Sequence, residues 1–148
     1  MEHNLSLLVT HITPLLENLS SSEMAKLNKK VGADLRKSQQ SRITAQLNPD
    51  GSSYTPRRLR DGKRLRKKMF SKLKTYRYFR NLSNAERVSV GFINSIGRIA
   101  KVHQFGLRDR VQKNGPTTTY SRRELLGFTD AEILKIEQSV LCHVKKKY

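Results

Sequence analysis

The side chains that could carry acid–base, nucleophilic or metal chemistry are few and lie far apart along the chain. There are four histidines and one cysteine, Cys142, and they form neither the i,i+4 histidine pair of a zinc-binding helix nor a reactive cysteine with an orienting acid. One cysteine also excludes an intrachain disulfide and a cysteine-based zinc site. We therefore expect no catalytic residue, no enzymatic activity, no cofactor and no metal. His103 and Cys142 are interpreted as structural residues.

Positive charge is the property that points to a function. The chain has 148 residues, with 30 Lys and Arg against 12 Asp and Glu, and its formal net charge is +18. Between Arg57 and Arg80 lie twelve basic residues and one acid, Asp61, so that +11 falls within 24 residues. Because like charges at this density repel one another, residues from about 50 to 68 are expected to form a mobile arm.

The densest part of this run could serve more than one purpose. Its side chains could neutralise phosphates, with Tyr76, Tyr78 and Phe79 offering stacking faces, or they could meet an acidic protein surface. They could also be a solvated arm without a specific role, since charge alone does not separate phosphates from carboxylates. The candidate partner-facing or DNA-facing residues are Arg57, Arg58, Arg60, Lys63, Arg64, Arg66, Lys67 and Lys68.

Two helices are predicted before this arm. Apolar residues at helical spacing predict an amphipathic helix over residues 4–18, which Pro14 should end or kink. This stretch is shorter than the roughly 20 residues of a membrane span, so no membrane partner is expected. Ser20 and Glu23 have the spacing of a capping box. They predict a second helix that ends at the turn residues 48–53.

Strand and helix patterns alternate after the arm. Residues 75–82 and 87–92 predict a hairpin, residues 94–105 a helix that ends at Gly106, and residues 117–120 a strand. A second capping box begins at Thr129 and starts the last helix. The inward residues of that helix are expected to be Ile133, Ile136, Val140 and Val144.

Several segments, taken in order, resemble one known family. They are Ser38-Gln-Gln-Ser-Arg-Ile43, Asn48-Pro-Asp-Gly-Ser52, Met69-Phe-Ser-Lys-Leu73, Val90-Gly-Phe92, Arg98-Ile-Ala-Lys-Val-His-Gln-Phe-Gly106 and Arg122-Arg-Glu-Leu-Leu-Gly-Phe128. Together they resemble the phage virion morphogenesis proteins, the tail-completion protein S family of contractile-tailed phages. The resemblance extends from about residue 5 to residue 145.

The resemblance implies a fold and a function. The fold is α+β, one domain over residues 1–148 with N- and C-terminal helices packed on a small antiparallel sheet and a long basic loop, in agreement with the mixed pattern above. The function is that of a structural neck protein that completes the tail and is needed for head–tail joining. It would be located in the virion and assembled in the host cytoplasm.

The implied partners are other structural proteins of the virion. They are copies of this chain in a ring, such as a hexamer, together with tail tube or terminator proteins and head connector proteins, and the arm could also contact DNA in the channel. Of these we favour an acidic protein ring for the arm. The alternative class is a free, basic nucleic-acid-binding protein of phage origin, although no helix-turn-helix spacing is found.

Two of the matched segments are candidate site residues outside the arm. Each is expected to serve the fold first and a subunit contact second, because apolar residues adjoin a helix end in both. The first segment is His103, Gln104, Phe105 and Gly106, and the second is Arg123, Glu124, Leu125, Leu126 and Gly127.

Overall fold

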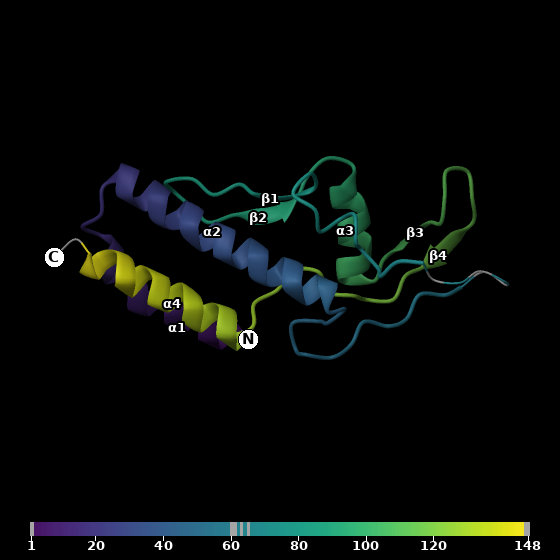
Figure 1. Ribbon diagram of the computed structural model, residues 1–148, viewed down its shortest axis with the longest axis horizontal. Helices are drawn as coiled ribbons and strands as arrows, with labels where there is room; N and C mark the ends of the chain where they lie inside the picture. The colour runs from purple at the N-terminus through teal and green to yellow at the C-terminus, as the bar shows by residue number, and fades with distance from the viewer. Residues whose placement is uncertain (1, 60–61, 63, 65, 147–148) are drawn as a thin grey trace. The chain divides into compact units, whose positions relative to one another are not determined.

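The computed structural model describes residues 2–59, 62, 64 and 66–146. Helices and short strands alternate along this part of the chain (Figure 1), which confirms the α+β fold class. The helices are α1 (Glu2–Leu16), α2 (Ser21–Thr44), α3 (Ile96–Phe105) and α4 (Asp130–Lys145). The strands are β1 (Phe79–Asn81), β2 (Val90–Phe92), β3 (Arg108–Arg110) and β4 (Thr117–Thr119).

Both predicted capping boxes are present. At the start of α2 the backbone N–H of Glu23 donates to the Ser20 hydroxyl over 3.2 Å, and the Glu23 carboxylate accepts from the Ser20 N–H over 3.0 Å. At the start of α4 Thr129 and Glu132 make the same reciprocal pair, at 3.1 and 3.0 Å. Each box satisfies N–H groups that the first turn of a helix leaves without an intrahelical acceptor.

Helix α1 continues through Pro14 and ends two residues later, at Leu16. The expectation that the helix could end at Pro14 is therefore wrong, and a kink there stays a prediction. Proline removes one backbone donor and crowds the carbonyl four residues before it. Because Pro14 lies in the last turn of α1, the missing donor and the steric crowding affect only the end of the helix. The preceding turns can therefore form undisturbed.

The chain forms two compact units. The first contains the chain up to Ser38, Asn81–Val90 and the chain from Phe128 onward; the second contains Gln39–Arg80 and Gly91–Gly127. Helix α2 contributes residues to both units, because its sequence passes from one to the other at Ser38. The expectation of one domain over residues 1–148 stays a prediction.

The first unit is a packing of helices. Helices α1 and α4 lie against each other (Figure 1), and apolar side chains of α1, α2 and α4 make its core. The residues in it are Leu27, Val31 and Val140, surrounded by Ile12, Leu16, Leu19, Ile136 and Val144. The predicted inward face of α4 is thereby confirmed. Cys142 is exposed, so its interpretation as a packing residue is wrong.

The second unit is built around aromatic and aliphatic side chains from five separate places in the sequence. Its buried cluster is Ile43, Tyr54, Phe70, Ala100 and Leu125, with Met69, Leu73 and Phe92 packed against it. Helix α3 contributes Ala100 to this core. The helix is capped by Gly106, whose φ of 62° and ψ of 48° give the left-handed conformation that the sequence predicts.

Both sheets are two-stranded. The pairing of β1 with β2 confirms the predicted hairpin, and its backbone bonds join Tyr78 to Ile93 and Leu82 to Ser89. The second sheet pairs β3 with β4 in antiparallel register, with Asp109 opposite Thr118. The sequence predicts only β4, because the Arg-Asp-Arg composition of β3 has no apolar alternation that would identify a strand.

None of the helices in the described part of the chain is long and apolar enough to cross a membrane.

Candidate functional site

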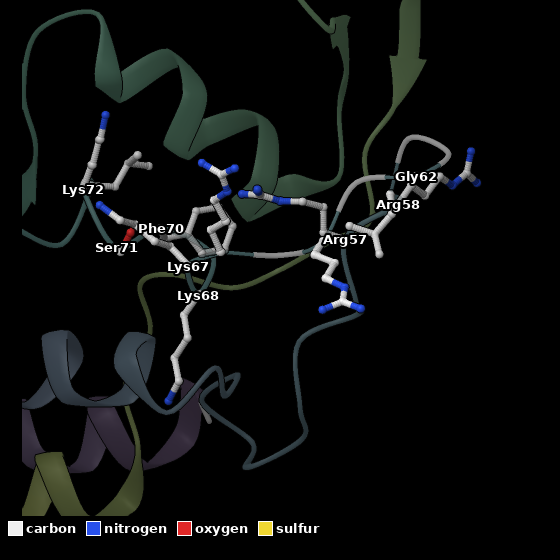
Figure 2. A pocket seen from close by; sticks show the side chains of 12 residues that line it. Arg57, Arg58, Gly62, Lys67, Lys68, Phe70, Ser71 and Lys72 are labelled. Atoms are coloured by element: carbon white, nitrogen blue, oxygen red, sulfur yellow. The ribbon is translucent and has the colours of Figure 1, made fainter.

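The described part of the basic segment surrounds an open hollow of about 1280 Å³ (Figure 2), which we call the basic hollow. Twelve described residues between Arg57 and Leu73 supply its lining, and seven of them are Lys or Arg. The cations are Arg57, Arg58, Arg64, Arg66, Lys67, Lys68 and Lys72. Of the predicted arm residues, Arg60 and Lys63 lie outside the described residues.

The charge of the basic hollow is not neutralised by the parts of the protein that the structure describes. All seven lining cations are exposed. The ion pairs in the described part of the second unit, Arg98 with Asp109 and Arg122 with Glu124, do not include any of them. Within the described residues, none of the seven is paired with a carboxylate. One member of this group is bonded to α2, since the Lys68 ammonium donates to the Thr44 carbonyl over 3.4 Å.

The chain enters the basic hollow from a point held by Arg123. This side chain is 6% exposed, and its Nε donates to the Thr55 carbonyl over 2.7 Å while its NH2 group donates to the Pro56 carbonyl over 3.2 Å. Just before them Tyr54 is buried, and its hydroxyl donates to the Glu124 carbonyl over 3.1 Å. Within the predicted arm, Tyr54 is thus part of the packed core, and Thr55 and Pro56 are held to it by hydrogen bonds.

The chain leaves the basic hollow at a second fixed point, made by Gln46. Its side-chain amide donates to the Met69 carbonyl over 2.9 Å and accepts from the Met69 N–H over 3.1 Å. The next residue, Phe70, has a φ of 63°, which is uncommon for a bulky side chain. Its ring packs edge-on against Tyr54 and His103, at centroid distances of 5.7 and 4.9 Å, and this burial holds the conformation.

His103 is a neutral hydrogen-bond acceptor inside this core. Its ring lies between Phe70 and Tyr120, and its Nδ1 is 3.4 Å from the NH1 group of Arg123. Burial, with the positive charges of Arg123 and Arg57, lowers the pKa of His103 to about 4. Since a guanidinium can only donate, Nδ1 must be the unprotonated nitrogen and the proton of the neutral ring resides on Nε2.

Arg123 is a buried cation without a carboxylate partner in the described part of the chain. Burial lowers the pKa of its guanidinium, and the nearby charge of Arg57 lowers it further. Two backbone carbonyls and the His103 ring take its hydrogen bonds in place of an acid. Positive charge is therefore concentrated at the point where the chain enters the basic hollow.

The other candidate segments hold the second unit together. The Gln104 amide donates to the Leu126 carbonyl over 2.8 Å and accepts from the Leu126 N–H over 2.9 Å. A β-carbon on Gly127 would lie 2.5 Å from the Pro49 ring, so the close approach of these two residues requires glycine. The carbonyl of Gly127 accepts from the Gln39 amide over 3.2 Å.

Most of the candidate residues outside the arm therefore have structural roles. Leu125 is fully buried, Gly106 caps α3, and Glu124 pairs with Arg122 while its backbone N–H donates to the Asn48 side chain. Phe105 differs, because it is 58% exposed at the end of α3. It is the member of this group with a large apolar surface left for another molecule.

Sequence reasoning did not single out Tyr54, Gln46 or Arg42 as anchors. Arg42 lies in the last turn of α2 and donates to the carbonyls of Leu47, Glu124 and Leu125. An isolated tyrosine within a polar turn region is a signal that could have identified Tyr54, since large aromatic residues usually find a core to pack in. No comparable signal marks the two others.

The site is thus a cation-lined surface on a hydrogen-bonded scaffold. Among the described residues there is no group of three His, Cys, Asp or Glu side chains that could hold a metal ion. The pattern of the phage virion morphogenesis family matches residues 4–145. This chain belongs to the phage virion morphogenesis family.

One curated relative extends this match. The chain is 38% identical over 140 residues to tail completion protein S of Escherichia phage P2, in an alignment that covers 91% of this chain and 93% of that protein. No solved structure matches the chain.

Proposed function

We propose that this protein is a structural component that completes a phage tail at its head-proximal end and is needed to join the tail to the head. The observation that carries the proposal is the match to tail completion protein S of phage P2 over nearly the full length of both chains. The protein would be part of the neck of the virion and would be assembled in the host cytoplasm. It would act by binding rather than by catalysis.

The proposed partners are tail tube or terminator proteins on one side and head connector proteins on the other. A protein that joins two assemblies needs a surface that its own fold does not use. The basic hollow is such a surface, because its cations are exposed and its two ends are held by Arg123 and Gln46. Loss of charge there should leave the core intact.

We also propose that the protein acts as a ring of identical copies, such as a hexamer. An apolar hollow of about 420 Å³, which we call the α3 groove, supports this proposal; it lies in the second unit beside the exposed ring of Phe105. Gly91 lines it, and a β-carbon added at Gly91 would meet nothing within 4 Å. Glycine weakens a strand and often marks the close approach of another chain. We assign this approach to a neighbouring copy.

Complementation of a phage that lacks this gene tests the proposed function. Without the protein we expect full heads and separate, apparently complete tails in electron micrographs. A variant with Arg57, Arg58, Arg60, Arg64 and Arg66 replaced by Ser should fold, as judged by circular dichroism, and should fail to restore infectious particles. Normal titres from that folded variant would show that the basic segment is not needed. Joined particles in the deletion phage would contradict the function itself.

A further inference from the structure

We infer that the basic hollow binds the phosphate backbone of double-stranded DNA without regard to base sequence. The proposed function gives the basic hollow a role in assembly, and this inference names the ligand of that hollow. It rests on the proposed function only for the location in the virion at which the protein would act. It departs from the expectation that an acidic protein ring is the partner. The reasons are the composition of the lining, the way its ends are held and its lack of regular structure.

The composition of the lining fits a polyphosphate better than a protein surface. Stable protein interfaces depend on buried apolar and aromatic anchors at their centre. In the basic hollow Phe70 is 9% exposed and already packed in the core, whereas Leu59 is 53% exposed. Among the described lining residues, Leu59 is thus the one exposed large apolar side chain beside seven exposed cations. Such an excess of cations over apolar anchors is typical of protein–DNA interfaces.

The type of cation in the lining also favours binding to phosphates. Four of the seven are arginines, Arg57, Arg58, Arg64 and Arg66. The planar guanidinium binds two phosphate oxygens at once, and its charge persists at every physiological pH. Duplex DNA presents one negative charge for about every 1.7 Å of its axis. Several side chains in one hollow can thus be neutralised together.

The fold holds the like charges together before any ligand arrives. Arg123 fixes Thr55 and Pro56 at the entrance, and Gln46 fixes Met69 at the exit, so the segment between them must return to the same core. Positive groups at the entrance already oppose one another: burial is the main cause of the lowered pKa of Arg123, and the nearby charge of Arg57 lowers it further. A polyanion would relieve this repulsion, and that relief favours binding.

The surface offers no element that would read bases. Sequence is read in DNA mainly by a helix or a β-ribbon inserted in the major groove. The described residues that line the basic hollow belong to no helix or strand. Contacts should therefore be made to phosphates, and the affinity should depend on salt rather than on base sequence.

Fluorescence anisotropy with the purified full-length chain and a labelled duplex of about 20 base pairs tests the inference. If all seven lining cations contact phosphates, the logarithm of the binding constant should fall with the logarithm of salt concentration with a slope of about −6. A variant with Arg57, Arg58, Arg64 and Arg66 replaced by Gln should reduce the slope to about −3. Two duplexes of unrelated sequence should bind equally.

The matched control removes the same amount of charge elsewhere. Lys26, Lys29, Lys135 and Lys145 are exposed residues of helices α2 and α4, and their replacement by Gln should leave the slope near the wild-type value. Circular dichroism checks that each variant is folded. If the four-Arg variant did not fold, Arg64→Gln alone should lower the magnitude of the slope by about 1.

Three outcomes would overturn the inference. One is an equal loss of the salt-dependence slope in the hollow variant and in the control, because DNA binding would then depend only on the net charge of the protein. A second is an unchanged slope in the hollow variant. The third is a polyglutamate peptide that competes as well as DNA of equal charge, since the partner would then be an acidic protein surface. None of these results bears on complementation, so failure here leaves the proposed tail function standing.

Discussion

Arg123 donates from Nε to the carbonyl oxygen of Thr55 over 2.7 Å, and the two residues are 68 positions apart in the sequence. The bond ties the segment after β4 to the start of the basic hollow. It is a charge-assisted bond from a side chain that is 6% exposed, and such bonds are stronger than those between neutral groups. The position of the first cations in the hollow therefore depends on a residue from another part of the chain.

Arg123→Met should free Thr55 and Pro56, where the chain enters the basic hollow, from their attachment to the core. The substitution keeps an apolar stem of similar length but removes the donors to Thr55 and Pro56. We expect the free energy of unfolding to fall by about 1–3 kcal/mol and trypsin to cleave faster after Arg57 and Arg58. Urea denaturation and timed proteolysis measure the two effects. Arg122→Met is the control, because the neighbouring Arg122 is exposed and bonds only to Glu124 in the described structure. Equal cleavage rates in the two variants would contradict the anchoring role.

The pH dependence of stability should show the neutral state of His103. Its pKa is lowered from 6.5 to about 4 in the folded protein, by burial and by Arg123 and Arg57. Between these values the unfolded chain binds more protons than the folded one, so the free energy of unfolding should fall as pH falls through this range. Urea denaturation at pH 7 and pH 5 measures the loss. In His103→Gln, which retains an acceptor for Arg123, the loss should be smaller; an equal loss would assign it to other groups.

Val140→Asp should prevent stable folding of the first unit. Val140 is 3% exposed in the cluster with Leu27 and Val31, so its replacement would bury an unpaired carboxylate at a cost of about 3–5 kcal/mol. Leu134→Asp places the same charge on the same helix at a position that is 54% exposed, and its effect should be within about 0.5 kcal/mol. Thermal unfolding followed by circular dichroism compares them. Similar melting temperatures would show that α4 packs differently.

Gly91→Leu should block the proposed ring while leaving the fold intact. The new side chain would enter the α3 groove, where a β-carbon meets no atom within 4 Å. We expect the wild-type mass in light scattering to rise with protein concentration and the variant to remain smaller. Ser22→Leu, which adds the same side chain at an exposed position of α2, should behave like wild type. Identical association of all three proteins would exclude the α3 groove as the contact.

Local signals in the sequence were sufficient for the helices. The capping boxes at Ser20 and Thr129 were predicted correctly because their partners lie three residues away, within reach of a single helical turn. Gly106 was predicted as a helix end for a similar reason, since the left-handed cap has a strong preference for glycine. The inward face of α4 followed from spacing alone.

Other features depended on contacts that no local pattern encodes. Gln39 in α2 is 4% exposed, although its polar side chain carries no sequence signal of burial. The side-chain amide nitrogen of Gln39 can be buried because it donates a hydrogen bond to the carbonyl of Gly127, which lies 88 positions later in the chain. Strand β3 was missed because it forms by pairing with β4, without an apolar face of its own.

The sequence by itself determined the excess of positive charge, the order of the helices and the family, since each can be recognised from residue types and their near neighbours. Only the tertiary structure decided which groups His103, Gln104 and Arg123 contact and that the basic segment is held at both ends. These properties depend on hydrogen bonds from side chains to backbone or side-chain groups 20 or more positions away. Such pairs form when packing brings distant segments together and removes water from them, so their strength and their partners are properties of the folded chain.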